Sequence, residues 1–208
     1  MYLNGLCFIP ARKRSCLTLK EIVTIVLSSG VRCIQYREKD KSRRDIYREA
    51  LILRKLTNEF GAVFIVNDYT DIVLAVNADG VHLGQKDLPL KEARKIFGEE
   101  KIIGISTHNI DEAIAAEAGG ADYIGFGPIF HTATKDAGKP KGIAALREIK
   151  ELIKIPVVAI GGINTENLES VIDSGADAVA VASAILKGNI SENITRFLKV
   201  LYRENQIV

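Results

Sequence analysis

The sequence predicts a single (β/α)8 barrel of the TIM-barrel class, in which each of eight parallel strands is followed by a helix. Short apolar runs rich in β-branched residues alternate strictly with segments of helical periodicity, eight of each. Four helix ends, at Gly30, Asn77, Gly120 and Gly175, precede strands at intervals of roughly 50 residues, the length of two βα units. This repeat fits a closed barrel better than an open doubly wound sheet. No linker divides the chain, so residues 1–208 are predicted to form one catalytic domain.

Recognisable caps bound the first two units. Residues 3–9 form the first predicted strand, and Thr18-Leu-Lys-Glu21 has the capping-box pattern that opens a helix. Gly30 can end that helix in the left-handed conformation before a strand at residues 31–36. Ser42 then begins a long helix whose apolar positions lie three and four residues apart.

The remaining units continue the alternation. Residues 62–66 are an apolar run too short for a helix, as expected for a strand buried on both faces. The later strands are predicted at residues 81–83, 102–105, 123–126, 157–160 and 178–181. The later helices are predicted at residues 71–76, 90–97, 111–118, 144–153, 167–173 and 190–202.

Composition argues against several classes of protein. The 208 residues are 47% hydrophobic, and the formal net charge is +2, so a sizeable core is expected and a nucleic-acid-binding face is not. Neither a membrane span nor a signal peptide is predicted. Cys7, Cys16 and Cys33 lack CxxC or zinc-site spacing, which predicts reduced thiols in a cytoplasmic protein. Self-association into a homo-oligomer is left open.

Cationic residues end the second predicted strand, and in such barrels the chemistry occurs at the carboxyl ends of the strands. In Gln35-Tyr-Arg-Glu-Lys39, alternation places Gln35, Arg37 and Lys39 on one face. Two cations beside an amide suit a phosphate or a pyrophosphate. The alternative is that the cations form surface ion pairs with Glu38 or Asp40.

Carboxylates follow the third and fourth strands. Asp68 comes directly after Asn67, and Asp87 lies in the turn after the fourth strand. Two carboxylates with few other ligands could hold Mg²⁺, which prefers oxygen and keeps water and phosphate oxygens around it. The alternative is that each aspartate caps the helix that follows it. An anion at the same barrel mouth favours the metal interpretation, because its charge needs a counterion.

The longest loop, residues 127–142, is dense in Gly, Pro, Thr and Lys and separates the sixth strand from its helix. Thr132, Thr134 and Lys135 present two hydroxyls and an ammonium, a combination suited to a phosphate or a polar ring. A long loop in a compact domain is often functional, and this one is the candidate lid. The alternative is a solvated surface loop.

Small residues end the last two strands. Gly161-Gly162 and Ala182-Ser183 precede helix N-termini and predict a phosphate cradle. Ser106, after the fifth strand, could donate to a ligand or begin a turn, while His82 is expected in or beside the barrel and His131 in a loop. The strand ends therefore predict two anion sites, as an enzyme that joins two phosphorylated molecules would need.

Taken together, these motifs resemble the thiamine-phosphate synthase family over nearly the whole chain. The matching runs are residues 35–39, 67–68, 79–87, 104–108, 127–135, 159–162 and 181–183. The resemblance implies transfer of a pyrimidinylmethyl group from its diphosphate to the nitrogen of a thiazole phosphate, which yields thiamine phosphate and pyrophosphate. It also implies a dissociative reaction, in which pyrophosphate leaves first and the aminopyrimidine stabilises a methylene cation.

The resemblance assigns a partner to each motif, residue by residue. The pyrimidine diphosphate would contact Gln35, Arg37, Lys39, Asn67, Ser106 and Lys135. Of these, Arg37, Lys39, Ser106 and Lys135 would be catalytic. The thiazole phosphate would contact Thr132, Thr134, Gly162, Ala182 and Ser183. Tyr36, Glu38 and Ala133, in the same motifs, are also assigned to substrate binding, and Asp68 and Asp87 would hold Mg²⁺.

The chain departs from the family pattern at its first strand. That strand commonly ends in Thr-Asp in the family, whereas Pro10 and Arg12 stand there in this chain, so the first loop contributes differently. The related thiazole tautomerase has a His directly after the leading Gly of the long loop, where this chain has Pro128. The tautomerase also need not retain the diphosphate and metal residues. A non-catalytic regulatory binder is the alternative of another class, and it would leave the metal residues unexplained.

Overall fold

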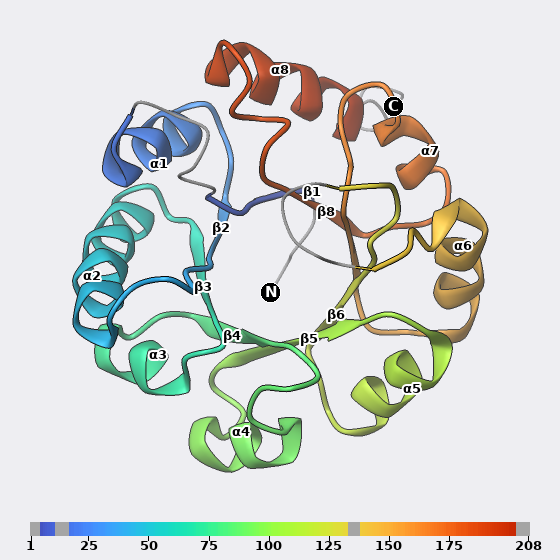
Figure 1. Cartoon of the computed structure of the whole chain (residues 1–208), viewed down its shortest axis with the longest axis horizontal. Coiled ribbons are helices and arrows are strands. Elements are labelled where there is room, and N and C mark those ends of the chain that lie inside the picture. Colours follow the sequence, from blue (N-terminus) through green and yellow to red (C-terminus); the bar gives the residue numbers. More distant parts are fainter. Residues whose placement is uncertain (1–4, 11–16, 133–137, 203–208) are drawn as a thin grey trace.

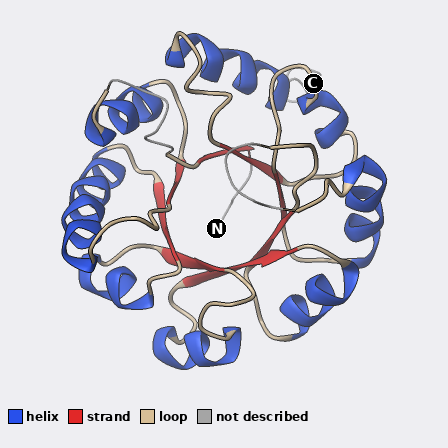
Figure 2. Ribbon diagram, in the orientation of Figure 1, coloured by secondary structure: helices blue, strands red, loops and turns tan. Residues whose placement is uncertain are grey.

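A closed ring of eight parallel strands surrounded by eight helices is formed by the part of the chain that the computed structural model describes, residues 5–10, 17–132 and 138–202 (Figure 1). Seen down the barrel, the strands make the inner ring and the helices the outer ring (Figure 2). The strands pair in sequence order, and the eighth closes on the first. The predicted (β/α)8 barrel is confirmed.

The elements agree closely with the predicted ones. The strands are β1 (Gly5–Phe8), β2 (Cys33–Tyr36), β3 (Val63–Asn67), β4 (Gly80–Leu83), β5 (Ile102–Thr107), β6 (Tyr123–Phe126), β7 (Val157–Ile160) and β8 (Ala178–Val181). The helices are α1 (Leu19–Ser28), α2 (Arg43–Glu59), α3 (Thr70–Val76), α4 (Leu90–Phe97), α5 (Ile110–Ala118), α6 (Gly142–Leu152), α7 (Leu168–Ile172) and α8 (Ile190–Leu201). None of the described helices has both the length and the apolar character needed to cross a membrane.

Side-chain alternation along the strands creates two apolar regions. The larger region lies between strands and helices, where residues such as Phe8, Ile34 and Phe64 are fully buried. The smaller region lies inside the barrel and includes Cys7 and Cys33, which face each other on β1 and β2. Their sulfur atoms are 3.1 Å apart and the thiols are free, as predicted, while Cys16 lies outside the described residues.

The predicted helix ends have the expected backbone conformation. Gly30, Asn77, Gly120 and Gly175 adopt φ values of 104°, 51°, 83° and 87°, in the left-handed region that glycine and asparagine tolerate. The Thr18 capping box is also present. The chain can therefore leave each of these helices and turn directly into the next strand.

An aspartate lies two residues after three of these helix ends and explains why the same short motif recurs every two βα units. Asp177 donates its backbone N–H to the carbonyl of Val157, and its Oδ2 accepts from the Val157 N–H at 2.7 Å and from Lys150 Nζ at 2.6 Å. The equivalent partners are Phe64 and Arg54 for Asp79, and Ile103 and Arg94 for Asp122. Each aspartate thus joins an even strand, the preceding odd strand and the helix that leads into that odd strand, at the end of the barrel opposite the predicted site.

Candidate active site

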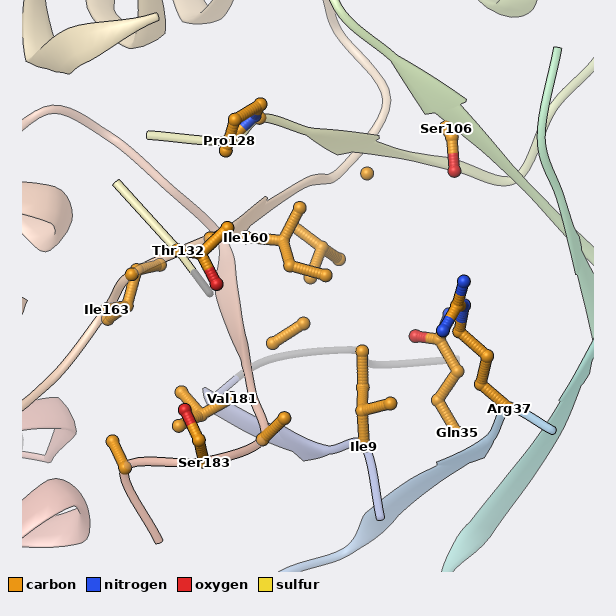
Figure 3. Close-up of a pocket in the computed structure, with 18 of the residues that line it drawn as sticks. Ile9, Gln35, Arg37, Ser106, Pro128, Thr132, Ile160, Ile163, Val181 and Ser183 are labelled. Carbon is orange, nitrogen blue, oxygen red and sulfur yellow. The ribbon is translucent and has the colours of Figure 1, made fainter. Parts of the chain in front are cut away.

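A cavity of about 420 Å³ opens at the carboxyl ends of the strands. Eight of the residues predicted to bind substrate line it: Gln35, Arg37, Asn67, Ser106, Thr132, Gly162, Ala182 and Ser183. Figure 3 shows Gln35 and Arg37 on one side of the cavity, with Thr132 and Ser183 on the other. Ser106 lies on the same side as Arg37. The two predicted anion sites therefore face each other across one cavity.

Arg37 presents a half-buried cation to this cavity. No carboxylate forms an ion pair with it among the residues that the structure describes. The alternative of surface pairing with Glu38 or Asp40 is wrong for Lys39 as well, because Lys39 Nζ lies 2.6 Å from Asp68 Oδ2. A guanidinium that is half removed from water without a protein counterion is poised to bind an anion.

Gln35 and Asn67 form a buried amide pair at the base of the same side. Their side chains are only 4% and 7% exposed, and Gln35 Nε2 donates to Asn67 Oδ1 at 2.7 Å. The Cys7 thiol donates a weak hydrogen bond to Gln35 Oε1 at 3.7 Å. Because the Asn67 oxygen is already an acceptor, its amide nitrogen remains to donate to a ligand.

Asp68, Asp87 and Lys39 form a charged cluster next to Asn67, which lines the cavity. Asp68 is held at φ 66°, a left-handed conformation that is costly for most residues but accessible to Asp and Asn. Its buried Oδ2 receives no well-directed hydrogen bond from the described residues and is matched only by the charge of Lys39. Burial and the negative charge of neighbouring Asp68 raise the pKa of Asp87, although the Gly84 N–H and Lys39 partly oppose this.

These features fit a bound divalent cation. Two adjacent carboxylates, one with a raised pKa at Asp87 and one with a buried oxygen at Asp68 that lacks a hydrogen-bond partner among the described residues, form an oxygen-rich donor set of the kind Mg²⁺ uses together with phosphate oxygens. The described residues contain no group of three or more His, Cys, Asp or Glu side chains that could hold a metal, so the ligand would have to complete the shell.

The helix-capping alternative for the two aspartates is wrong. The residues at the N-caps of α3 and α4 are Tyr69 and Pro89, and neither helix has a side-chain cap. Asp87 Oδ2 instead accepts from the Gly84 N–H at 2.7 Å, which folds the loop after β4 back on itself. That bond positions the carboxylate beside Asp68.

The glycine pair after β7 allows two loops to pack closely on the other side of the cavity. Gly161 and Gly162 have φ values of 99° and 67°. A Cβ at Gly162 would lie 2.5 Å from the carbonyl oxygen of His131 and 2.8 Å from Phe130 Cβ. The Phe130 N–H also donates to the Gly161 carbonyl at 3.0 Å. Only glycine therefore lets the β7 turn touch the loop that carries Thr132.

We expect Gly162→Ala to lower the free energy of unfolding by about 1–3 kcal/mol, from left-handed strain and the contact with His131. It should also raise the KM for the ligand predicted to bind here, the thiazole phosphate that the resemblance implies, by about ten- to a hundredfold, because the backbone at residue 162 would shift. Thermal melts and steady-state kinetics check both effects. Gly61→Ala is the matched control, because Gly61 has φ 59° and open space around it. Equal effects of the two variants would contradict the packing argument.

The other predicted residues include some that lie outside the cavity, one whose local structure differs from the prediction and some that are not described. The Tyr36 side chain faces the helices and donates to Glu49 Oε2 at 2.7 Å, and Glu38 contacts Lys41 outside the cavity. Ser106 belongs to β5 rather than to a turn, because β5 runs two residues beyond its predicted end. Ala133, Thr134, Lys135 and Arg12 fall outside the described residues.

The cavity also includes residues that the sequence analysis did not select. Ile9, Ile160, Ile163 and Val181 give it apolar walls (Figure 3). Lys187, between β8 and α8, adds a cation to the lining. The only signal for it in the sequence was its position four residues after Ser183. His131 and Pro128 line the cavity too, as do the buried His82 and Tyr123. His82 thus lies inside the barrel, as expected.

The chain is similar to known proteins along nearly all of its length. The family described as thiamine monophosphate synthase matches residues 6–185. A thiamine-phosphate synthase from Methanosarcina barkeri is 49% identical over 188 residues, covering 89% of this chain and 84% of that protein. One from Clostridium novyi is 48% identical over 182 residues, with coverage of 87% and 89%. The solved structure of thiamine phosphate pyrophosphorylase from Pyrococcus furiosus has a TM-score of 0.88 and 38% identity and covers 96% of each chain. This chain therefore belongs to the thiamine monophosphate synthase family.

Proposed function

We propose that this chain is a thiamine-phosphate synthase. It transfers the 4-amino-2-methylpyrimidin-5-ylmethyl group from its diphosphate to 4-methyl-5-(2-phosphoethyl)thiazole and forms thiamine phosphate and pyrophosphate. One observation carries the proposal: a single cavity has Arg37, which has no ion-pair partner among the described residues, on one side and Thr132 and Ser183 on the other. The cluster of Lys39, Asp68 and Asp87 lies next to Asn67, which also lines the cavity. Two phosphorylated substrates need two such sites that face each other.

The diphosphate side assists departure of the leaving group. As the C–O bond to the pyrimidine methylene breaks, negative charge grows on pyrophosphate, and Arg37 and Lys39 stabilise it. Lys135, which the resemblance assigns to the same role, would add a third cation. Asp68 and Asp87 would hold Mg²⁺, which when bound supplies further neutralisation of the pyrophosphate charge. The amide nitrogen of Asn67 and the hydroxyl of Ser106, which both line the cavity, would donate hydrogen bonds to the pyrophosphate.

The thiazole side completes the transfer by positioning. The ring nitrogen already carries a lone pair, so it forms the new C–N bond with the methylene cation without a general base. Its phosphate would rest on the backbone at Gly162 and on the hydroxyls of Thr132 and Ser183. Apolar Ile9 and Ile160 limit water at the reacting carbon, where water would otherwise capture the cation as an alcohol.

The alternatives explain fewer of these features. A thiazole tautomerase moves protons within one ring, and it would have no use for Arg37 or for paired aspartates at a second anion site. A regulatory binder would need the anion sites but would give no turnover. The sequence leaves self-association open, and light scattering after gel filtration would measure the oligomeric state.

One assay tests the proposed function. The purified chain is mixed with the pyrimidine diphosphate, the thiazole phosphate and Mg²⁺, and thiamine phosphate and pyrophosphate are quantified. Equal amounts of the two products are expected, and EDTA should stop both. Binding of each substrate by calorimetry without product would support the regulatory binder instead. Consumption of a thiazole isomer without the pyrimidine substrate would support the tautomerase.

A further inference from the structure

Three polar side chains inside the barrel form a chain that the proposed mechanism does not use as a unit. Tyr123 Oη lies 2.9 Å from His82 Nδ1, and His82 Nε2 lies 2.8 Å from Ser106 Oγ. They come from three neighbouring strands, β6, β4 and β5, and all three line the cavity. Tyr123 and His82 are only 2% and 6% exposed, so their hydrogen bonds form in a medium of low polarity.

Two glycines create the space for this contact. In the strand register, Gly104 lies between His82 on β4 and Tyr123 on β6. A Cβ at Gly104 would lie 2.0 Å from Tyr123 Cζ, and one at Gly125 would lie 2.9 Å from His82 Cε1. With both positions lacking side chains, the two rings approach to 5.5 Å between centroids across the intervening strand. The barrel interior is thus shaped around this pair of rings.

The direction of the hydrogen bonds follows from the buried tyrosine. Burial raises the pKa of Tyr123 well above the ordinary value of a phenol, so the hydroxyl keeps its proton. Its hydrogen-bond partner among the described residues is His82 Nδ1, and a buried hydroxyl hydrogen without an acceptor is costly, so we assign the hydroxyl as the donor and Nδ1 as the acceptor. A neutral imidazole that accepts at Nδ1 carries its proton on Nε2. That N–H donates to Ser106 Oγ, so the hydroxyl hydrogen of Ser106 must point elsewhere.

We propose that Tyr123 and His82 are positioning residues that orient the hydroxyl hydrogen of Ser106 toward the cavity, where it donates to an anionic oxygen of the diphosphate. The inference rests on the proposed function for the identity of the ligand. Without this chain Ser106 could rotate and present its lone pairs, which repel an anion. With the chain, Ser106 faces the ligand as a donor before the ligand arrives, which lowers the cost of binding and of charge development.

The tautomer of His82 is the first test, and it does not depend on catalysis. The chain has three histidines. In a long-range ¹H–¹⁵N spectrum of protein labelled at histidine, the His82 signals are assigned as those lost in His82→Gln. A neutral ring protonated on Nε2 is expected. A proton on Nδ1, or an imidazolium protonated on both nitrogens, would overturn the inference while leaving the proposed function intact.

A double-variant cycle is the second test. Ser106→Ala is expected to lower kcat for pyrophosphate release by about a hundredfold, the effect of losing one preorganised donor. Tyr123→Phe should lower kcat about tenfold, with the KM for the thiazole phosphate unchanged, because the tyrosine ring remains and only one hydrogen bond is lost. If Tyr123 acts through Ser106, adding Tyr123→Phe to Ser106→Ala should cause a further loss of less than about twofold.

If the fold-losses in kcat of the two single variants multiply in the Ser106→Ala/Tyr123→Phe double variant, Tyr123 does not act through Ser106. Tyr47→Phe is the matched control, because Tyr47 is exposed on α2, and it should leave all rates unchanged. Thermal melts identify any variant that fails to fold, and the wild-type spectrum keeps the inference testable in that case. If the wild-type protein forms no thiamine phosphate in the assay, that result would instead count against the proposed function alone.

Discussion

Asp68→Asn is expected to lower the Mg²⁺-dependent rate of pyrophosphate release by about a thousandfold while the barrel stays folded. The substitution removes the negative charge from the carboxylate that faces Asp87 and pairs with Lys39 at 2.6 Å. Asparagine has nearly the same size and tolerates the left-handed φ of 66° at this position. The charge effect is therefore separated from backbone strain, which Asp68→Ala would add.

Initial rates of pyrophosphate release over a series of Mg²⁺ concentrations measure this effect, and circular dichroism confirms folding. Asp71→Asn is the matched control, because Asp71 is 61% exposed and pairs with Arg43 on the surface. The control should behave like the wild-type protein. Unchanged turnover and an unchanged Mg²⁺ requirement in Asp68→Asn would remove the proposed metal site.

Arg37→Ala is expected to lower kcat/KM for the pyrimidine diphosphate by about a hundred- to a thousandfold, while the KM for the thiazole phosphate changes little. Arg37 faces the cavity beside Gln35 and away from Thr132 and Ser183 (Figure 3). Arg37→Lys should recover only part of the loss, because an ammonium cannot form the paired hydrogen bonds of a guanidinium. Kinetics with each substrate varied in turn separate the two constants.

Although Arg37→Ala should lose activity, it is not expected to lose stability. Because Arg37 has no ion-pair partner among the described residues, its removal should leave the melting temperature unchanged or slightly raised. Arg48→Ala, at an exposed position paired with Asp45, is the control and should change neither kinetics nor stability appreciably. A larger effect on the thiazole phosphate than on the pyrimidine diphosphate would show that the two subsites have been assigned the wrong way round.

Much of the fold and part of the site could be predicted from sequence because they depend on neighbouring residues in the chain. The capping box at Thr18 and the left-handed Asn77 are local structures, and both were identifiable. Alternation within one strand was also enough to separate Arg37, which faces the cavity, from Tyr36, which faces the helices.

Other features depend on contacts between strands. Whether Lys39 would pair with Glu38, Asp40 or Asp68 could not be decided from sequence, because Asp68 lies on the neighbouring strand loop and its distance depends on register and side-chain conformation. The two extra residues of β5 likewise arise from pairing with β6, where Ser106 lies opposite Gly125. A run of apolar residues does not specify where such pairing ends.

The periodic pattern, the caps and the glycine turns were enough to establish a barrel, its order of elements and the polar residues at its mouth, because each reflects the conformational preferences of a short segment. The folded chain was needed to pair Asp68 with Asp87 and Lys39, and to join Tyr123, His82 and Ser106 into one hydrogen-bonded chain. These contacts join residues that lie up to about 40 positions apart, and they form only once strand register and close packing bring the side chains within hydrogen-bonding distance.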